Sequence, residues 1–423
     1  MRYLPHTPQD RQAMLKKIGV NDIDALYAHV PTAKRAPYNF PLANHLGEAQ
    51  VESLLNKLAE RNHSAVDGPF FLGAGCYHHH VPASVDYIIQ RSEFMTAYTP
   101  YQPEIAQGTL TYLFEFQSYV ARLFGQDIAN ASMYDGATAT AEAALMARRI
   151  TKRNNVTIAG SLHPHTQEVI QTYLGQLGGQ ITTDTNSDTA CIIVSYPGFN
   201  GEVPDLTVLR AKADAIGALL VVTVPEIIAL GLLPAPSMAD IVTGEGQSIG
   251  VGMNFGGPHL GLFACKETYL RQMPGRLCGQ TVDADGKRSF TLTLSTREQH
   301  IRREKATSNI CTNQGLCALA FTVHLSLLGE TGFIKLAQLN HQKACQLADA
   351  LSKVKGVKVL NQTFFNEFVV ELPTNAKALV EQLATKGIIA GYPMGEKQLL
   401  VTATELTTDE HISTFTTALQ EVL

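Results

Sequence analysis

Polar and aromatic side chains crowd the segment Tyr98–Gly108, which reads YTPYQPEIAQG. Its two prolines oppose regular secondary structure, while its tyrosines, glutamines and glutamate supply hydroxyl, amide and carboxylate groups within a few positions. Such groups on a rigid loop could form one wall of a ligand site, because binding residues concentrate on loops. A loop packed against another subunit is an equally good interpretation, and both can hold. The candidate site residues here are Tyr98, Thr99, Tyr101, Gln102 and Glu104, with Tyr77 from the upstream stretch FLGAGCYHHHVP.

A second chemical signal lies in Ala239–His259, which reads ADIVTGEGQSIGVGMNFGGPH. A short apolar strand leads into a loop with glycine and serine, and a glycine-rich turn follows at Gly256–Pro258. This layout is typical of the segment that carries the cofactor lysine in pyridoxal-phosphate enzymes, but Gln247 stands at the lysine position. An amide cannot condense with an aldehyde, so Gln247 cannot form the Schiff base.

A second anchor of such a cofactor is also missing. The pyridine nitrogen needs an acidic partner, which is expected near the end of the predicted strand GALLVVTV. Val222 stands at that position, and Glu226, beyond Pro225, is a weak substitute. Because both anchors are absent together, we interpret Val222 and Gln247 as vestigial cofactor-site positions.

Three more positions match the remaining parts of such a site. Asp135 and Thr138 flank the start of a predicted helix, where N–H groups could hold a phosphate. Ordinary N-capping by either residue explains them equally well. His163 follows the predicted strand Val156–Ala159, where a side chain commonly stacks on a planar cofactor ring. The alternative is a solvated or capping histidine.

Two clusters of charged or metal-binding residue types are weaker signals. His78–His80 are adjacent loop positions that point in different directions, and no ligand set at suitable spacing supports them, so we predict no metal site. The segment Ser295–Thr312 is rich in cations that could bind carboxylate or phosphate, or could form a solvated helix face. The cations are Arg297, Arg302, Arg303 and Lys305, with Arg276 nearby. Lys266 and Lys305 both lack the sequence context of a Schiff-base lysine.

The elements that must position these residues alternate between strands and helices from about residue 127. The predicted elements are a helix at Ala137–Ile150, a strand at Val156–Ala159, a helix at Thr166–Leu174, strands at Ala131–Met133, Cys191–Ser195, Leu219–Val224, Ile241–Val242 and Leu262–Cys265, and a helix at Leu206–Ala215. This alternation predicts an α/β fold with a large, mostly parallel sheet between helices.

The remaining chain differs at both ends. Residues 1–65 read as helical and extended, with a helix start at Thr7–Asp10, an amphipathic stretch at Glu48–Glu60 and prolines at positions 31, 37 and 41. We predict a large α/β domain over 66–310, then linking helices and a small C-terminal α+β domain over 311–423. Its predicted elements are helices at Cys311–Leu328, Phe333–Val354, Ala376–Leu383 and Asp409–Val422, with Thr407 and Glu410 as a capping box, and strands at Val357–Leu360, Phe368–Leu372 and Leu399–Thr402.

Composition excludes several classes of protein. A charged fraction of 17% and a hydrophobic fraction of 45% fit a globular chain. A net charge of −5 without basic runs argues against nucleic-acid binding. No run approaches the roughly 18 uncharged apolar residues of a membrane span, and the N-terminal residues lack the apolar core of a signal peptide. We therefore expect a cytoplasmic protein whose seven cysteines, without CxxC spacing, are reduced thiols.

Several of these stretches together resemble the glycine decarboxylase family, the P-protein of the glycine cleavage system. The resemblance is strongest to its N-terminal half, which some bacteria make as a separate subunit 1. The matching stretches are Tyr98–Gly108, Asn130–Ala143, Ser195–Glu202, Gly256–Gly261, Met273–Thr281 and Thr296–Thr312.

This resemblance implies the aspartate-aminotransferase-like architecture, fold type I of pyridoxal-phosphate enzymes. It implies decarboxylation of glycine with pyridoxal phosphate and transfer of the aminomethyl group to the lipoyl arm of H-protein. It also implies that the cofactor lysine lies on subunit 2, that this chain completes the partner's site, and that two copies of each subunit form a heterotetramer. A self-sufficient pyridoxal-phosphate decarboxylase or aminotransferase and a non-catalytic scaffold remain as rival readings.

Overall fold

The computed structural model describes residues 6–35, 42, 44–95, 98–254 and 256–423, in two compact units, Met1–Asn62 and His63–Leu423. The first unit contains helices α1 (Pro8–Ile18) and α2 (Glu48–Ala59), with short 3-10 turns η1 (Asp24–Tyr27) and η2 (Thr32–Lys34). The predicted start of α1 is confirmed, because Thr7 and Asp10 form a reciprocal capping box. No residue of α1 or α2 is buried. Pro37 and Pro41 lie outside the described residues.

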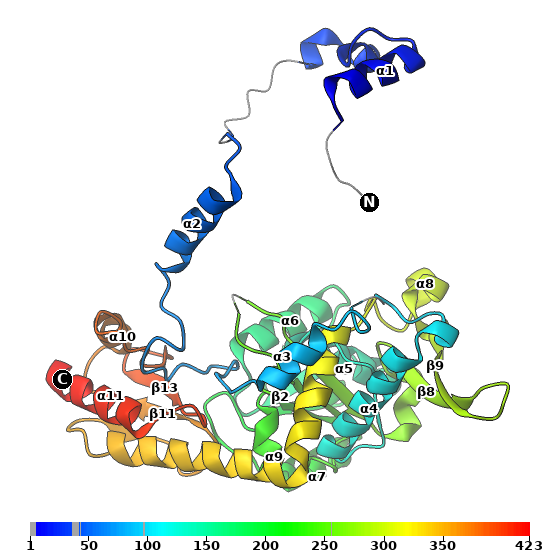
Figure 1. The fold of residues 1–423 in the computed structure, drawn as a ribbon. Helices are drawn as coiled ribbons and strands as arrows, with labels where there is room; N and C mark the ends of the chain where they lie inside the picture. Colours follow the sequence, from blue (N-terminus) through cyan, green and yellow to red (C-terminus); the bar gives the residue numbers. More distant parts are fainter. Residues whose placement is uncertain (1–5, 36–41, 43, 96–97, 255) are drawn as a thin grey trace. The chain divides into compact units, whose positions relative to one another are not determined.

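A seven-stranded sheet forms the centre of the second unit (Figure 1). Its strand order is β1-β7-β6-β5-β4-β2-β3. The strands are β1 (Ile128–Ala129), β2 (Asn155–Ala159), β3 (Ile181–Thr182), β4 (Thr189–Ser195), β5 (Leu219–Val224), β6 (Ile241–Glu245) and β7 (Gly261–Cys265). Pairs among β2 to β6 are parallel, and β7 runs antiparallel to both β6 and β1. This confirms the predicted mostly parallel sheet.

Helices cover both faces of this sheet, as continuous apolar strands require. Leu220, Val222 and Val224 of β5 pack in one core with α4 and α9. Leu219 and Val221 pack in a second core on the opposite face, with α5 and α6. The helices are α3 (Ala83–Ile89), α4 (Gln107–Phe124), α5 (Gly136–Thr151), α6 (Pro164–Gly175), α7 (Leu206–Ile216) and α9 (Gly315–Leu351).

Several elements were not predictable from the patterns described above. They are α3, the buried α4, and a two-stranded hairpin of β8 (Leu277–Val282) and β9 (Arg288–Thr293). The predicted strand at Ala131–Met133 is wrong, since only Met133 makes an isolated bridge, to Gly261. Short helical turns complete the unit: η3 (Pro103–Ile105), η4 (Ile227–Gly231), η5 (Glu267–Gln272), η6 (Ser295–Arg297), α8 (Gln299–Arg302) and η7 (Arg303–Lys305).

The long helix α9 connects the central sheet to the C-terminal elements (Figure 1). Its backbone departs from helical geometry at Gly329, where φ is 57° and ψ is −177°, so two helical stretches meet there as predicted. Among the described residues, α9 alone has the length and apolar composition that a membrane span needs, and half of its most apolar stretch is buried. A core helix satisfies the same two criteria.

A four-stranded antiparallel sheet with two helices forms the predicted small α+β region. Its strand order is β10-β11-β13-β12. The elements are β10 (Lys358–Val359), β11 (Glu367–Glu371), α10 (Ala376–Ala384), β12 (Tyr392–Pro393), β13 (Gln398–Thr402) and α11 (Asp409–Val422). The predicted capping box of α11 is wrong by one residue: Thr408 caps the helix by accepting the N–H of His411, while Thr407 accepts the N–H of Thr404.

Candidate functional site

The carboxyl ends of the parallel strands meet at one edge of the central sheet, the usual location of ligand sites in open α/β folds. The start of α5 lies at this edge. Asp135 is its N-cap: Oδ1 accepts the N–H of Thr138 at 2.7 Å, and Oδ2 accepts the Thr138 hydroxyl at 2.8 Å. Both predicted residues therefore serve the capping role that the sequence left open.

Glu245, at the end of β6, binds a further N–H group at the start of α5. Its Oε2 accepts the N–H of Gly136 at 3.0 Å, and its Oε1 accepts those of Leu260 at 2.7 Å and Gln247 at 3.0 Å. Burial raises the pKa of this carboxyl to about 7, although the three N–H groups favour the ionised form. No sequence pattern pointed to Glu245.

Gln247 follows two residues later and is directed into its own loop. It is only 2% exposed, and its Nε2 donates to the carbonyl of Val251 at 2.7 Å. Its Oε1 is buried and has no hydrogen-bond partner among the described residues. The side chain thus closes a turn and offers no nucleophilic amine.

Val222 lies in the core with α4 and α9, on the face of β5 that is turned away from α5. Because strand side chains alternate, the next residue, Thr223, faces α5. The hydroxyl of Thr140 in α5 donates to Thr223 at 3.1 Å and lies 3.0 Å from the Thr243 hydroxyl. Val222 therefore contributes to the core, and its neighbour Thr223 presents a hydroxyl to α5.

A buried ion cluster lies next to these strands. Glu226 accepts the Ser248 hydroxyl at 2.9 Å and the N–H of Ile228 at 2.9 Å, and one of its oxygens lies 3.1 Å from Nε2 of His79. Nδ1 of His79 lies 2.8 Å from Oε2 of Glu405. Burial favours neutral His79, but Glu226 and Glu405 outweigh it and raise the His79 pKa.

Tyr77 is buried beside this cluster. Its hydroxyl donates to Oε2 of Glu367 at 2.8 Å, and the N–H of Ala74 donates to Oε1 of the same carboxylate at 2.6 Å. Burial raises the pKa of Glu367 to about 7. Tyr77 therefore belongs to the interior and does not share the exposed surface of Tyr98 and Tyr101.

His163 caps α6 through Nδ1, which accepts the N–H of His165 at 3.1 Å. Its Nε2 lies 3.0 Å from the carbonyl of Ala74. Gly75, at φ +93°, lies against the ring so closely that a Cβ there would be 3.0 Å from Cδ2 of His163. His163 therefore caps α6, and the backbone of Ala74 and Gly75 lies against one edge of its ring.

These positions do not fit pyridoxal phosphate. The N–H of Gly136 at the helix start binds the Glu245 carboxylate, and the lysine position holds an amide. The cavity beside Tyr77, Glu226 and Glu367 measures about 10 Å³, the space of about one water molecule.

The segment Tyr98–Glu104 lies on the surface. Tyr98 is 81% and Tyr101 56% exposed, Gln102 and Glu104 are exposed, and Thr99 is half-buried. The large apolar side chains of Tyr87 and Met95, which precede this segment in the chain, and of Ile105, which follows it, are also exposed. A surface that exposes this much apolar area is typical of an interaction site.

Arg276, a buried residue, contacts this surface from the interior of the molecule. It is 2% exposed, its guanidinium carbon lies 5.5 Å from the Tyr101 ring centroid, and it donates to the Tyr101 hydroxyl at 3.4 Å. It also donates to the carbonyl of Cys311 and to the side chains of Thr312 and Asn313. The structure therefore brings Tyr98–Glu104 and the segment Ser295–Thr312 together.

The other predicted cations divide into two groups. Arg297 is buried and donates to the carbonyls of Met273 and Gly275, so it is structural. Arg302, Arg303 and Lys305 are exposed. Lys266 pairs with Asp240 at 3.2 Å.

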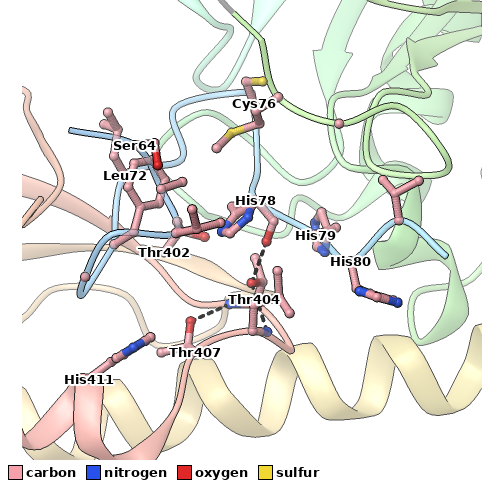
Figure 2. Close-up of a pocket in the computed structure, with 18 of the residues that line it drawn as sticks. Ser64, Leu72, Cys76, His78, His79, His80, Thr402, Thr404, Thr407 and His411 are labelled. Carbon is pink, nitrogen blue, oxygen red and sulfur yellow. Dashed lines mark hydrogen bonds between the residues drawn. The ribbon is translucent and has the colours of Figure 1, made fainter. Parts of the chain in front are cut away.

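A large open cavity of about 1050 Å³ lies between the segment Ser64–Val81, the loop Gly252–Asn254 and the C-terminal sheet (Figure 2). His78, His80 and His411 line it. The hydroxyl of Thr404 donates to the carbonyl of His78 at 2.7 Å, which ties one wall to the other. No sequence signal identified this cavity.

Comparisons with known proteins agree over the whole chain. The family model described as glycine cleavage system P-protein matches residues 1–419. A "Probable glycine dehydrogenase (decarboxylating) subunit 1" of Rhodospirillum centenum is 56% identical over 450 residues, covering 100% of both chains. A protein of the same name from Azorhizobium caulinodans is 54% identical over 446 residues, again covering 100% of both.

Comparison with solved structures identifies the fold. A crystal structure of glycine decarboxylase (P-protein) of the glycine cleavage system, in inhibitor-bound form, superposes with a TM-score of 0.92 at 40% identity, covering 100% of both chains. A sphingosine-1-phosphate lyase of Burkholderia pseudomallei has a TM-score of 0.64 at 15% identity, covering 91% of this chain and 92% of its own, and is similar in fold alone. The architecture is that of fold type I pyridoxal-phosphate enzymes.

Proposed function

This chain belongs to the glycine cleavage system P-protein family, and we propose that it acts as subunit 1 of a glycine dehydrogenase (decarboxylating) whose subunit 2 binds the pyridoxal phosphate. The observation that carries the proposal is the full-length match to proteins named subunit 1, combined with an amide at the lysine position and a carboxylate at the helix start. In the complex, pyridoxal phosphate on subunit 2 supplies the electron sink for glycine decarboxylation. The aminomethyl group then passes to the lipoyl arm of H-protein.

This chain's own contribution is an ordered surface beside the partner's pocket. Tyr98, Thr99, Tyr101, Gln102 and Glu104 lie on it, and they orient glycine and admit the lipoyl arm. Arg276 limits the motion of Tyr101, which reduces the entropy lost when the site assembles. Tyr77, held by Glu367 in the interior, supports the adjacent vestigial site.

The assembly is a heterotetramer with two copies of each subunit. The exposed Tyr87, Met95 and Ile105 next to the polar segment supply the apolar contacts of the subunit interface. Glycine and the lipoyl H-protein are the other partners of the complex.

Reconstitution tests this proposal. The chain alone, subunit 2 alone and the co-expressed pair are compared by size and by exchange of bicarbonate with the carboxyl group of glycine, with H-protein present. We expect exchange only from the pair, and the visible absorbance of bound pyridoxal phosphate only where subunit 2 is present. Such absorbance from this chain alone would favour the rival reading of a self-sufficient decarboxylase.

Variants of the exposed segment separate a catalytic contribution from a scaffold. Tyr101→Phe and Glu104→Gln are each expected to lower kcat of the reconstituted pair about 10-fold or more, the usual effect of losing one positioned group. Assembly, measured by size, stays intact. Unchanged kinetics would remove these residues from the site, and loss of assembly alone would favour a scaffold.

A further inference from the structure

The start of α5 is a complete anion-binding arrangement. The first turn of a helix presents N–H groups that the helix cannot pair, and such groups bind phosphate in many enzymes. Here Gly136 allows a close approach, because a Cβ on it would lie 3.2 Å from Cβ of Glu245 and from the main chain of Gly244. A larger residue would push the acceptor away from the helix.

The carboxylate of Glu245 already occupies the position that an anion would take at the start of α5. Its two oxygens accept three N–H groups that come from separate segments, those of Gly136, Gln247 and Leu260. Nδ1 of His259 lies 3.8 Å from Oε2. Several donors converging on one anion is the pattern of a phosphate site, and the side chain is only 12% exposed.

The neighbouring space is narrow. The carbonyl of Ala74 lies 3.0 Å from Nε2 of His163, Gly75 lies against the same edge of that ring, and Ala74 is fixed in turn by Glu367 through a 2.6 Å hydrogen bond. The adjacent cavity of about 10 Å³ has no room for a pyridine ring.

We infer that this chain fills the phosphate position of its own former cofactor site with the Glu245 carboxylate. The inference extends the proposed division of labour between subunits, but it rests on the geometry of this chain. It follows that removing the carboxylate leaves an anion cradle that an inorganic phosphate can enter.

The test uses the full chain without partner or cofactor, so its failure would leave the proposed function untouched. Thermal unfolding of Glu245→Ala is measured in potassium phosphate and in potassium chloride of equal ionic strength and pH. We expect phosphate at about 10 mM to raise the Tm of Glu245→Ala by several degrees and to leave the wild type unchanged, because a ligand that binds only the folded state stabilises it.

Two further variants act as controls. Glu142→Ala removes another buried carboxylate, from the middle of α5, and Glu245→Gln fills the cradle without charge; neither should respond to phosphate. If Glu245→Ala is obtained only unfolded, phosphate should raise its refolding yield and not that of Glu142→Ala. An equal response of all variants, or none from Glu245→Ala in either measurement, would overturn the inference.

Discussion

Glu245 makes the stability of this chain depend on pH at the scale of one residue. Its pKa is raised by burial to about 7, from 4.5, and Asp135 adds to the rise. A carboxyl with a higher pKa in the folded state holds its proton more tightly when folded. The stability that this proton adds is complete below about pH 4.5 and is lost as the pH rises through about 7.

Glu245→Gln has no proton to lose in this range. Relative to the wild type, its free energy of unfolding should therefore rise by up to about 3 kcal/mol between roughly pH 5 and 8. Urea unfolding at a series of pH values measures the difference. Glu371→Gln, an exposed change, should give an offset that is independent of pH. The same constant offset from Glu245→Gln would contradict the prediction.

Arg276 is the residue on which the exposed segment depends. Its guanidinium reaches Tyr101, Cys311, Thr312 and Asn313, a span that a lysine ammonium cannot reproduce. Arg276→Lys should destabilise the chain by about 3 kcal/mol, since buried acceptors lose their donors. We also expect kcat of the reconstituted pair to fall more than its KM changes.

The matched control is Arg302→Lys, because Arg302 is exposed in the same region. That variant should stay within about 0.5 kcal/mol of the wild type. Urea unfolding and steady-state kinetics report both variants. Equal effects from Arg276→Lys and Arg302→Lys would show that the buried contacts do not position the segment.

At the residue scale, sequence reasoning identified local contexts but not the contacts between distant segments. Asp135, His163 and Gln247 were identified by local context, a helix start, a strand end and a loop, and these contexts persist in the structure. Glu245 was missed because its partner Gly136 lies 109 positions away. Arg276 was grouped with a surface cluster, and only its contacts across 175 positions show it to be buried.

At the scale of elements, His79 joins parts of the fold that are distant in sequence. It lies between Glu226, in the turn after β5, and Glu405, in the turn before α11. The N–H of His80 also donates to Glu405, and Asn340 of α9 donates to the same carboxylate. A single imidazolium therefore links the central sheet to the C-terminal region.

His79→Gln leaves two buried carboxylates facing each other without a cation. We expect a loss of about 3–5 kcal/mol near pH 7. Since Glu405 has a lowered pKa, its contribution exists above about pH 4.5 and is lost as the pH falls toward 2, so the penalty of the variant should shrink in acid. Urea unfolding at neutral pH and near pH 3 measures this, with His78→Gln as the control. A penalty that is the same at both pH values would argue against the ion cluster.

Element prediction succeeded where strands and helices alternate and failed where buried polar residues interrupt the apolar face of a helix. The strands β4 and β5 are short apolar runs, and their type was clear because helices alternate with them. The helix α4 was missed because polar residues such as Gln117 lie inside it, paired with Cys278 of the hairpin. The sequence spacing pointed to Val222, but it does not reveal which face of a strand that residue occupies, and Val222 lies in the core with α4 and α9.

At the scale of the whole molecule, the interior is closed and the surface beside it is open. The former cofactor site contains the chain's own groups, whereas Tyr98, Tyr101 and Ile105 remain exposed. A protein that has filled its own site but kept an exposed aromatic segment can contribute to catalysis only across an interface. The function of the chain is therefore best tested at that exposed surface.

Ile105 offers the sharpest test at this scale, because it is 79% exposed and makes little contribution to the fold of the isolated chain. Ile105→Asp places a charge in the proposed interface, where burial without a partner is costly. We expect the Tm of the isolated chain to change by no more than about 1 °C, since exposed substitutions are nearly neutral. Affinity for subunit 2 should fall at least about 10-fold, the cost of one unpaired polar group at an interface. Val208→Asp, on exposed positions of α7, is the matched control and should bind subunit 2 normally. Equal affinity of the two variants would place the subunit interface elsewhere on the molecule.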